Sequence, residues 1–166
     1  MNCIGLFGTC GNSKWRDSFI KNFKEQDIEY FNPLVEDWKP EDATIEAEHL
    51  ANDSILLFPI TKETYGVGSL SEVGFGILNA IKIDDRRDFI VMIENELDEE
   101  LMNDKERAKE SLRARALVLE HLKKHKFSNV YLVDTFDEMA NVARVLYQAN
   151  SIRSDIDKFS IKNKHS

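Results

Sequence analysis

The sequence lacks an excess of positive charge. Its 166 residues include 22 Lys and Arg against 30 Asp and Glu, which gives a formal net charge of −8. A protein that coats DNA or RNA usually presents a basic stripe, whereas the basic residues here are interleaved with acidic ones, as on a solvated helix face. We therefore expect no nucleic acid polymer as a partner.

Cysteines and long apolar runs are scarce as well. Cys3 and Cys10 show no Cys-x-x-Cys or Cys/His zinc spacing and are too few for a disulfide framework, so we expect reduced thiols, no metal and no cofactor. No apolar run approaches the roughly 20 residues that a membrane-spanning helix needs, and the N-terminal residues do not resemble a secretory leader. These absences predict a soluble, cytoplasmic protein with no membrane partner.

What is present is enough for one domain, since 42% of the residues are hydrophobic. Short apolar runs predict strands, and stretches with helical apolar spacing predict helices between them. The predicted strands are 3–7, 28–31, 54–58, 89–93 and 130–133, and the predicted helices are 15–26, 41–52, 69–83, 105–126 and 137–148.

This alternation predicts an α/β fold, a flavodoxin/Rossmann-like three-layer sandwich. We expect a five-stranded, mostly parallel sheet in the order 2-1-3-4-5. The α/β domain is predicted to span residues 1–150. Residues 151–166 are expected to form a polar tail that either frays or docks on a partner subunit.

Two loops are expected to meet in this fold. Ligands of such sheets bind beyond the carboxyl ends of the strands, at the point where the strand order reverses. The loop Gly8–Ser13, after the first strand, and residues 59–72, after the third, would lie side by side there. Gly8–Ser13 is suited to cradle an anion or a ribose, although it matches neither the dinucleotide fingerprint nor a Walker loop. Ser13 is also the predicted N-cap of the first helix.

The second loop carries a carboxylate at its end. Ser69 and Glu72 have the Ser-x-x-Glu spacing of a helix capping box. Glu72 is therefore either a helix cap or a reactive carboxylate at the pocket. Asp53, directly before the third strand, either braces the structure or points into the site. His49 is expected to be a packing or surface residue.

Four motifs in the first half of the chain resemble the nucleoside 2-deoxyribosyltransferase family in their order and spacing. Gly68-Ser69-Leu70-Ser71-Glu72-Val73-Gly74 resembles the family signature Gly-Ser/Thr-x-x-Glu-Ile/Leu-Gly. The other three are the Gly-Thr-Cys-Gly-Asn-Ser loop followed by Trp15-Arg16, then Phe31-Asn32-Pro33, and then Asn52–Pro59.

The resemblance implies that Glu72 is a nucleophile. It would attack C1′ of a 2-deoxynucleoside or deoxynucleotide, release the base and hold the deoxyribosyl group covalently. A second free base would then accept the sugar, or water would hydrolyse the intermediate. A helix N-terminus would favour the ionised glutamate by ~0.3–1 kcal/mol.

The resemblance and the two loops together give the candidate site. Glu72 and Asp53 are the catalytic candidates. The substrate-binding candidates are Gly8, Thr9, Cys10, Ser13, Trp15, Arg16, Asn32, Pro59, Gly68 and Ser69. Arg16 either binds a 5′-phosphate with Ser13 and Ser69 or pairs with an acidic surface residue.

The sequence departs from the family at two acidic positions. Pro59 and Gly66 stand where the well-studied transferases carry acids that hold the sugar and protonate the base. That proton would have to come from Asp53, Glu63, Tyr65, a neighbouring subunit or water. A nucleotide-sensing module without turnover is therefore an alternative. The apolar helix segment 73–81 predicts a homo-oligomer built from dimers.

Overall fold

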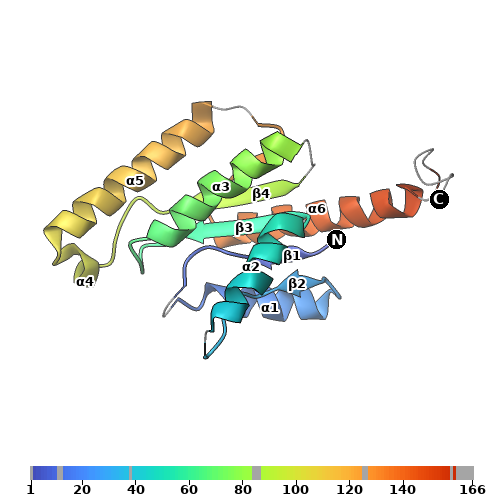
Figure 1. Ribbon diagram of the computed structural model, residues 1–166, viewed down its shortest axis with the longest axis horizontal. Coiled ribbons are helices and arrows are strands. Elements are labelled where there is room, and N and C mark those ends of the chain that lie inside the picture. Colours follow the sequence, from blue (N-terminus) through green and yellow to red (C-terminus); the bar gives the residue numbers. More distant parts are fainter. Residues whose placement is uncertain are drawn as a thin grey trace.

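The computed structural model describes residues 2–10, 13–37, 39–83, 87–124, 127–157 and 159, and of Phe75 and residues 77–83 it describes the backbone only (Figure 1). Within these residues five strands form one parallel sheet in the order β2-β1-β3-β4-β5. The strands are β1 (Ile4–Leu6), β2 (Tyr30–Phe31), β3 (Ile55–Ile60), β4 (Asp88–Ile93) and β5 (Val130–Leu132). The helices are α1 (Trp15–Glu25), α2 (Pro40–Asn52), α3 (Val67–Ile83), α4 (Glu99–Met102), α5 (Lys105–Lys124) and α6 (Phe136–Asp157). The predicted fold class and strand order are confirmed.

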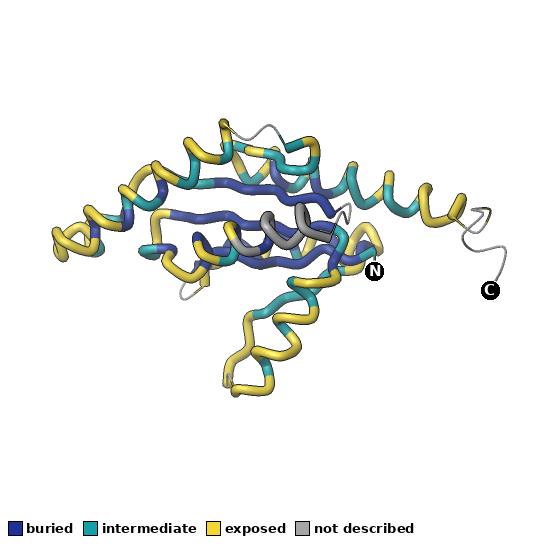
Figure 2. The backbone as a smooth tube through the Cα atoms, turned by 45° about the horizontal axis from the view of Figure 1, so that its top comes forward, coloured by how far each residue is buried: buried dark blue, intermediate teal, exposed yellow. Residues whose placement is uncertain are grey.

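Helices cover both faces of the sheet. On one face α1 and α6 pack with Trp15, Phe19, Phe23, Met139 and Ala143 against alternate strand residues. On the other face α2, α3 and α5 pack over Leu56, Phe58, Phe89 and Val91. Figure 2 shows the buried strands at the centre and the exposed outer turns of α2 and α5. Because β3 and β4 are covered on both sides, they read as continuous apolar runs rather than alternating ones.

Pro59 lies inside β3, where the sequence predicted that the strand had ended. The pairing of β3 with β1 stops at Leu57, whereas its pairing with β4 continues through Ile60. The Pro59 carbonyl accepts the N–H of Thr9 at 2.9 Å, so this edge of Pro59 faces the turn after β1. The missing N–H of proline therefore removes no bond of the ladder.

Gly8 makes this close approach possible. It has a φ of +98°, and a Cβ added to it would lie 2.6 Å from the Pro59 carbonyl oxygen. Only glycine combines that backbone conformation with that contact.

Three features of the helices also differ from the prediction. The residue that precedes α1 is Lys14, and Ser13 does not cap that helix. A short helix, α4, occupies part of the segment expected to be an acidic loop. α6 runs to Asp157, so its last turns replace the start of the expected tail; residues 160–166 lie outside the described part of the chain.

A hydrogen bond connects the last turns of α6 to the beginning of the chain. Asn2 donates to the Ser151 hydroxyl at 2.8 Å, and Ser151 donates to the carbonyl of Tyr147 one turn earlier. The polar composition of this segment suggested a loop, but it contains no Gly or Pro to end the helix. Among the described helices, none is both long and apolar enough to cross a membrane.

Candidate active site

A pocket of about 310 Å³ lies beyond the carboxyl ends of β1 and β3, where the two loops were expected to meet. Its wall combines the turn after β1, the segment that leads into α3, and one turn of α2. It is lined by Phe7, Gly8, Cys10, Arg16, Pro33, Glu46, Thr64, Gly66, Val67, Gly68, Ser69 and Glu72.

A larger hollow, of about 630 Å³, lies between α3 and α5 and shares Val67 with this pocket. Its other walls include Tyr65, Leu70 and Ala114, and its charged groups are Arg107 and Glu110. Arg107 is already paired with Asp104 at 3.4 Å. The smaller pocket is the better candidate for chemistry because it holds two carboxylates beside a buried guanidinium.

Glu72 does not cap α3. The helix begins at Val67, and the first helical bond runs from the N–H of Leu70 to the carbonyl of Gly66 at 2.9 Å. Ser69 is therefore already inside the first turn, and the capping-box interpretation is wrong. The Glu72 carboxylate lines the pocket instead.

The environment of Glu72 raises its pKa. Burial is the largest cause, the negative charge of Glu46 adds to it, and the positive charge of Arg16 opposes both. The expectation that the helix dipole favours the ionised form fails because Glu72 lies on the second turn, beyond the reach of the helix end.

Glu46 is the functional candidate that the sequence analysis missed. It extends from α2 into the same pocket, and burial raises its pKa while Arg16 lowers it. Several acids lie in the segment that forms α2, and nothing in the sequence separates Glu46 from them. The signal available was its helical spacing to His49 and Leu50, which share the inward side of α2.

Arg16 holds the turn after β1. Its side chain is 2% exposed, and it donates from Nε to the Leu6 carbonyl at 2.9 Å and from Nη1 to the Thr9 carbonyl at 2.6 Å. Its Nη2 reaches the Gly8 carbonyl at 3.4 Å. The expected pairing with a surface acid is therefore wrong. Burial lowers the pKa of Arg16, and its charge still acts on the two glutamates.

Arg115 holds the segment after β3 in the same way, by donating hydrogen bonds to main-chain carbonyls. It is fully buried on α5, and its two Nη atoms donate to the carbonyls of Ile60, Glu94, Thr61 and Thr64. Its Nε donates to the Ser111 hydroxyl at 3.3 Å. An arginine from each side of the sheet thus fixes one of the two loops that build the pocket.

Six of the predicted site residues meet in this pocket. They are Gly8, Cys10, Arg16, Gly68, Ser69 and Glu72. Gly11 and Asn12, the middle of the first loop, lie outside the described residues.

Five of the predicted binding residues do not line it. Trp15 belongs to the core, where it stacks on Phe136 with ring centroids 6.2 Å apart. The Thr9 hydroxyl accepts the N–H of Thr61 at 2.9 Å, so it braces the two loops. Asn32 accepts the N–H of Leu34 in a local turn, and its neighbour Pro33 faces the pocket instead. Ser13 and Pro59 are buried and do not line the pocket.

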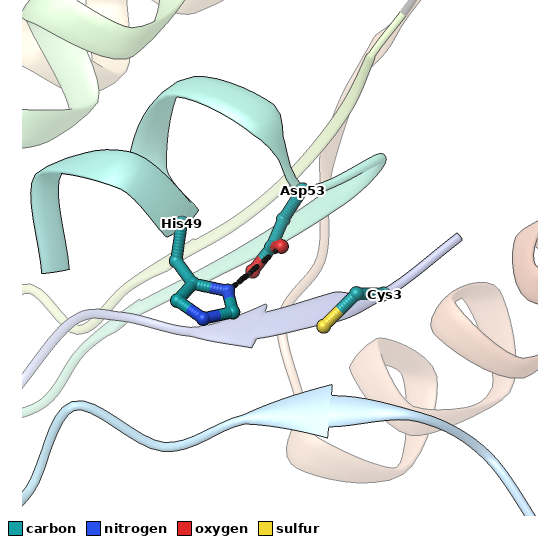
Figure 3. A group of neighbouring side chains, drawn as sticks. All are labelled: Cys3, His49 and Asp53. Atoms are coloured by element: carbon teal, nitrogen blue, oxygen red, sulfur yellow. Dashed lines mark hydrogen bonds and ion pairs between the residues drawn. The ribbon is translucent and has the colours of Figure 1, made fainter. Parts of the chain in front are cut away.

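Asp53 lies at the opposite edge of the sheet. It ends α2 just before β3 and does not line the pocket; its Oδ2 lies beside Gly5, where an added Cβ would be 3.0 Å from Asp53 Oδ2 and 2.4 Å from the ring of the pocket residue Phe7. Its buried carboxylate contacts His49 Nδ1 at 3.0 Å (Figure 3). Asp53 is therefore not among the residues that line the pocket with Glu72, and His49 has a partner that the sequence did not reveal.

The other expected proton donors face elsewhere. Glu63 is exposed and accepts the Thr61 hydroxyl, and the Tyr65 hydroxyl donates to the Leu101 carbonyl at 3.0 Å. Glu46 is thus the carboxyl group that the described pocket offers beside Glu72.

No protein-family model and no curated protein matches this chain. What the pocket does has to be inferred from its own chemistry.

Proposed function

We propose that this chain cleaves the N-glycosidic bond of 2-deoxynucleosides or deoxynucleotides through a covalent deoxyribosyl–Glu72 intermediate, like the nucleoside 2-deoxyribosyltransferases that its motifs resemble. One observation carries the proposal. Glu72 and Glu46 share a pocket at the β1–β3 switch point with buried Arg16, and both carboxyl groups have raised pKa values.

The two carboxyl groups divide the chemistry between them. Like charges in a half-buried pocket oppose full ionisation, so the pair tends to keep a proton. The positive charge of Arg16 favours one carboxylate in the same space. One ionised and one protonated carboxyl group are what a retaining glycosidic reaction needs.

In the first step an oxygen of ionised Glu72 bonds to C1′ while the C1′–N bond breaks and its electron pair leaves with the base. Protonated Glu46 gives its proton to the departing base. In the second step a nitrogen of another free base attacks C1′, the Glu72 carboxylate leaves, and Glu46 takes a proton from the incoming base. Water in place of that base gives hydrolysis.

Product analysis tests this proposal. Each deoxynucleoside and deoxynucleoside monophosphate is incubated with the protein, with and without a second free base, and the mixture is separated by chromatography. A new nucleoside that forms only with added base identifies a transferase, and free base without an acceptor identifies a hydrolase. Glu72→Gln should abolish either product, whereas Glu48→Gln, an exposed acid of the same pocket-lining helix as Glu46, should leave it unchanged.

A nucleotide-sensing module without turnover is the second candidate. The observation in its favour is that Pro59 and Gly66 occupy two positions where the resembled transferases carry acids. It predicts that a nucleotide raises Tm by mass action while no base is ever released. Base release that depends on Glu72 would eliminate it, and the absence of any product from all substrates would eliminate the enzymatic proposal.

A further inference from the structure

A second group of reactive side chains lies at the amino edge of the sheet and contains no residue that lines the pocket (Figure 3). Cys3 precedes β1, and His49 and Asp53 come from the last turn of α2 and its end. A thiol sulfur, an imidazole nitrogen and a carboxylate oxygen of these residues all lie within 4.8 Å of one another. Residues distant in the sequence thus converge on one point.

We propose that Cys3, His49 and Asp53 bind one Zn²⁺ ion. Thiolate, imidazole and carboxylate are the three ligand types that zinc uses in proteins, and the sulfur argues against Mg²⁺ and Ca²⁺. His49 Nδ1 is 3.0 and 3.1 Å from the two Asp53 oxygens, close to the spacing of two ligands on one zinc ion.

Charge and access both suit a divalent ion. Cys3 and Asp53 are buried, and a thiolate together with a carboxylate neutralises Zn²⁺, so the occupied site carries no net charge into the interior. The His49 side chain is 24% exposed, so one of the three ligands reaches the surface of the protein.

The surroundings hold the ligands in place. The His49 ring stacks on Phe31 with centroids 3.7 Å apart and planes 4° apart, which fixes the direction of Nδ1. Gly5 lets Phe7 and Asp53 approach β1 closely, because a Cβ there would lie 2.4 Å from Phe7 Cε2 and 3.0 Å from Asp53 Oδ2. The lack of ligand spacing along the chain predicted no metal site. Cys3, His49 and Asp53 come together only in the folded structure.

Zinc binding must displace a proton. The Cys3 thiol has to lose its proton to bind the ion as a thiolate. Affinity should rise with pH as a result.

The test uses the full chain, reduced and stripped of metal. Zn²⁺ is titrated by calorimetry, and Co²⁺ is added as a spectroscopic substitute. We expect one ion per chain, a proton released from Cys3, a raised Tm, and a thiolate-to-cobalt charge-transfer band. Cys3→Ser should remove the band, and both Cys3→Ser and His49→Gln should weaken Zn²⁺ binding at least ~10-fold.

Matched controls are the exposed residues Cys10 and His121. Cys10→Ser and His121→Gln should bind Zn²⁺ and Co²⁺ as the wild type does. Because the His49 side chain is partly exposed, we expect His49→Gln to remain folded. Circular dichroism checks this. Unchanged binding in folded Cys3→Ser or His49→Gln, or a cobalt spectrum without the thiolate band, would make the trio a hydrogen-bonded core group and end the proposal.

Discussion

At the scale of single residues, the proposed function depends on how two carboxyl groups share one proton. Burial raises the pKa of both Glu46 and Glu72, and the charge of Glu46 raises that of Glu72 further. Glu72 has to lose its proton to act as a nucleophile, whereas Glu46 has to keep one to act as an acid. Activity should therefore rise as pH passes the lower of the two apparent pKa values and fall as it passes the higher.

Glu46→Gln tests this division. The variant should lose about 10²–10⁴-fold in kcat/KM because it lacks the general acid. The alkaline fall of the pH profile should vanish, and the acidic rise should stay near its wild-type pH, because the protonated Glu46 of the active form carries no charge that acts on Glu72. The pH dependence of kcat/KM measures both limbs, with Glu48→Gln as the control. An unchanged alkaline limb would contradict the acid role of Glu46.

At the scale of elements, the pocket is held by two helices through arginines. α1 supplies Arg16 to the turn after β1, and α5 supplies Arg115 to the segment before α3. Both side chains are buried, and the partners named above are main-chain carbonyls and one hydroxyl. Loss of either would leave buried carbonyl groups without donors, which costs about 1–3 kcal/mol for each.

Arg115→Met should reduce the free energy of unfolding by roughly 3 kcal/mol or more, because several carbonyl groups lose their donor together. Arg113→Met, at an exposed position of the same helix, should stay within about 0.5 kcal/mol of wild type. Denaturant unfolding followed by circular dichroism compares the two variants. Equal stability would show that Arg115 is not needed to hold the segment after β3.

The elements were predictable where the local sequence decides them. The apolar runs at 54–58 and 89–93 gave the central strands, and the strand order then placed Gly8 and Glu72 at one edge. The boundary at Pro59 was not predictable, because a tertiary contact with Gly8 decides it. The start of α3 was placed too late, because the N–H of Leu70 already bonds to the carbonyl of Gly66 within the first turn. Glu46 and Arg115 are polar residues in charged helices, and only the packed fold shows that they face inward.

At the scale of the whole molecule, an apolar stripe on α6 has no partner within the described chain. Val145, Ile152 and Ile156 are 49%, 64% and 61% exposed. Their spacings of seven and four residues put them on one side of the helix. Figure 1 shows the end of α6 running past the sheet, so a second copy could pack along it. The expected oligomer face at 73–81 is different: Val73 is buried, and the side chains of 77–81 are not described.

We predict a homo-oligomer that packs through α6. Light scattering at micromolar concentration should give a multiple of 19.2 kDa. Replacing both Ile152 and Ile156 by Asp should return the monomer, because charges would enter the buried seam. Ser154→Asp, an exposed position on another side of α6, is the control. A wild-type mass of 19.2 kDa would refute the prediction.

The hydrogen bonds of Arg16 and Arg115 also affect which amino-acid substitutions the two loops tolerate. Arg16 and Arg115 bind carbonyl oxygens of the loops, and every amino acid carries one. Most loop side chains can therefore be exchanged without loosening the frame, whereas Gly8 and Gly66 stay constrained by their positive φ angles. Substitutions in these loops can therefore change what the pocket binds while the main-chain framework that supports it is retained.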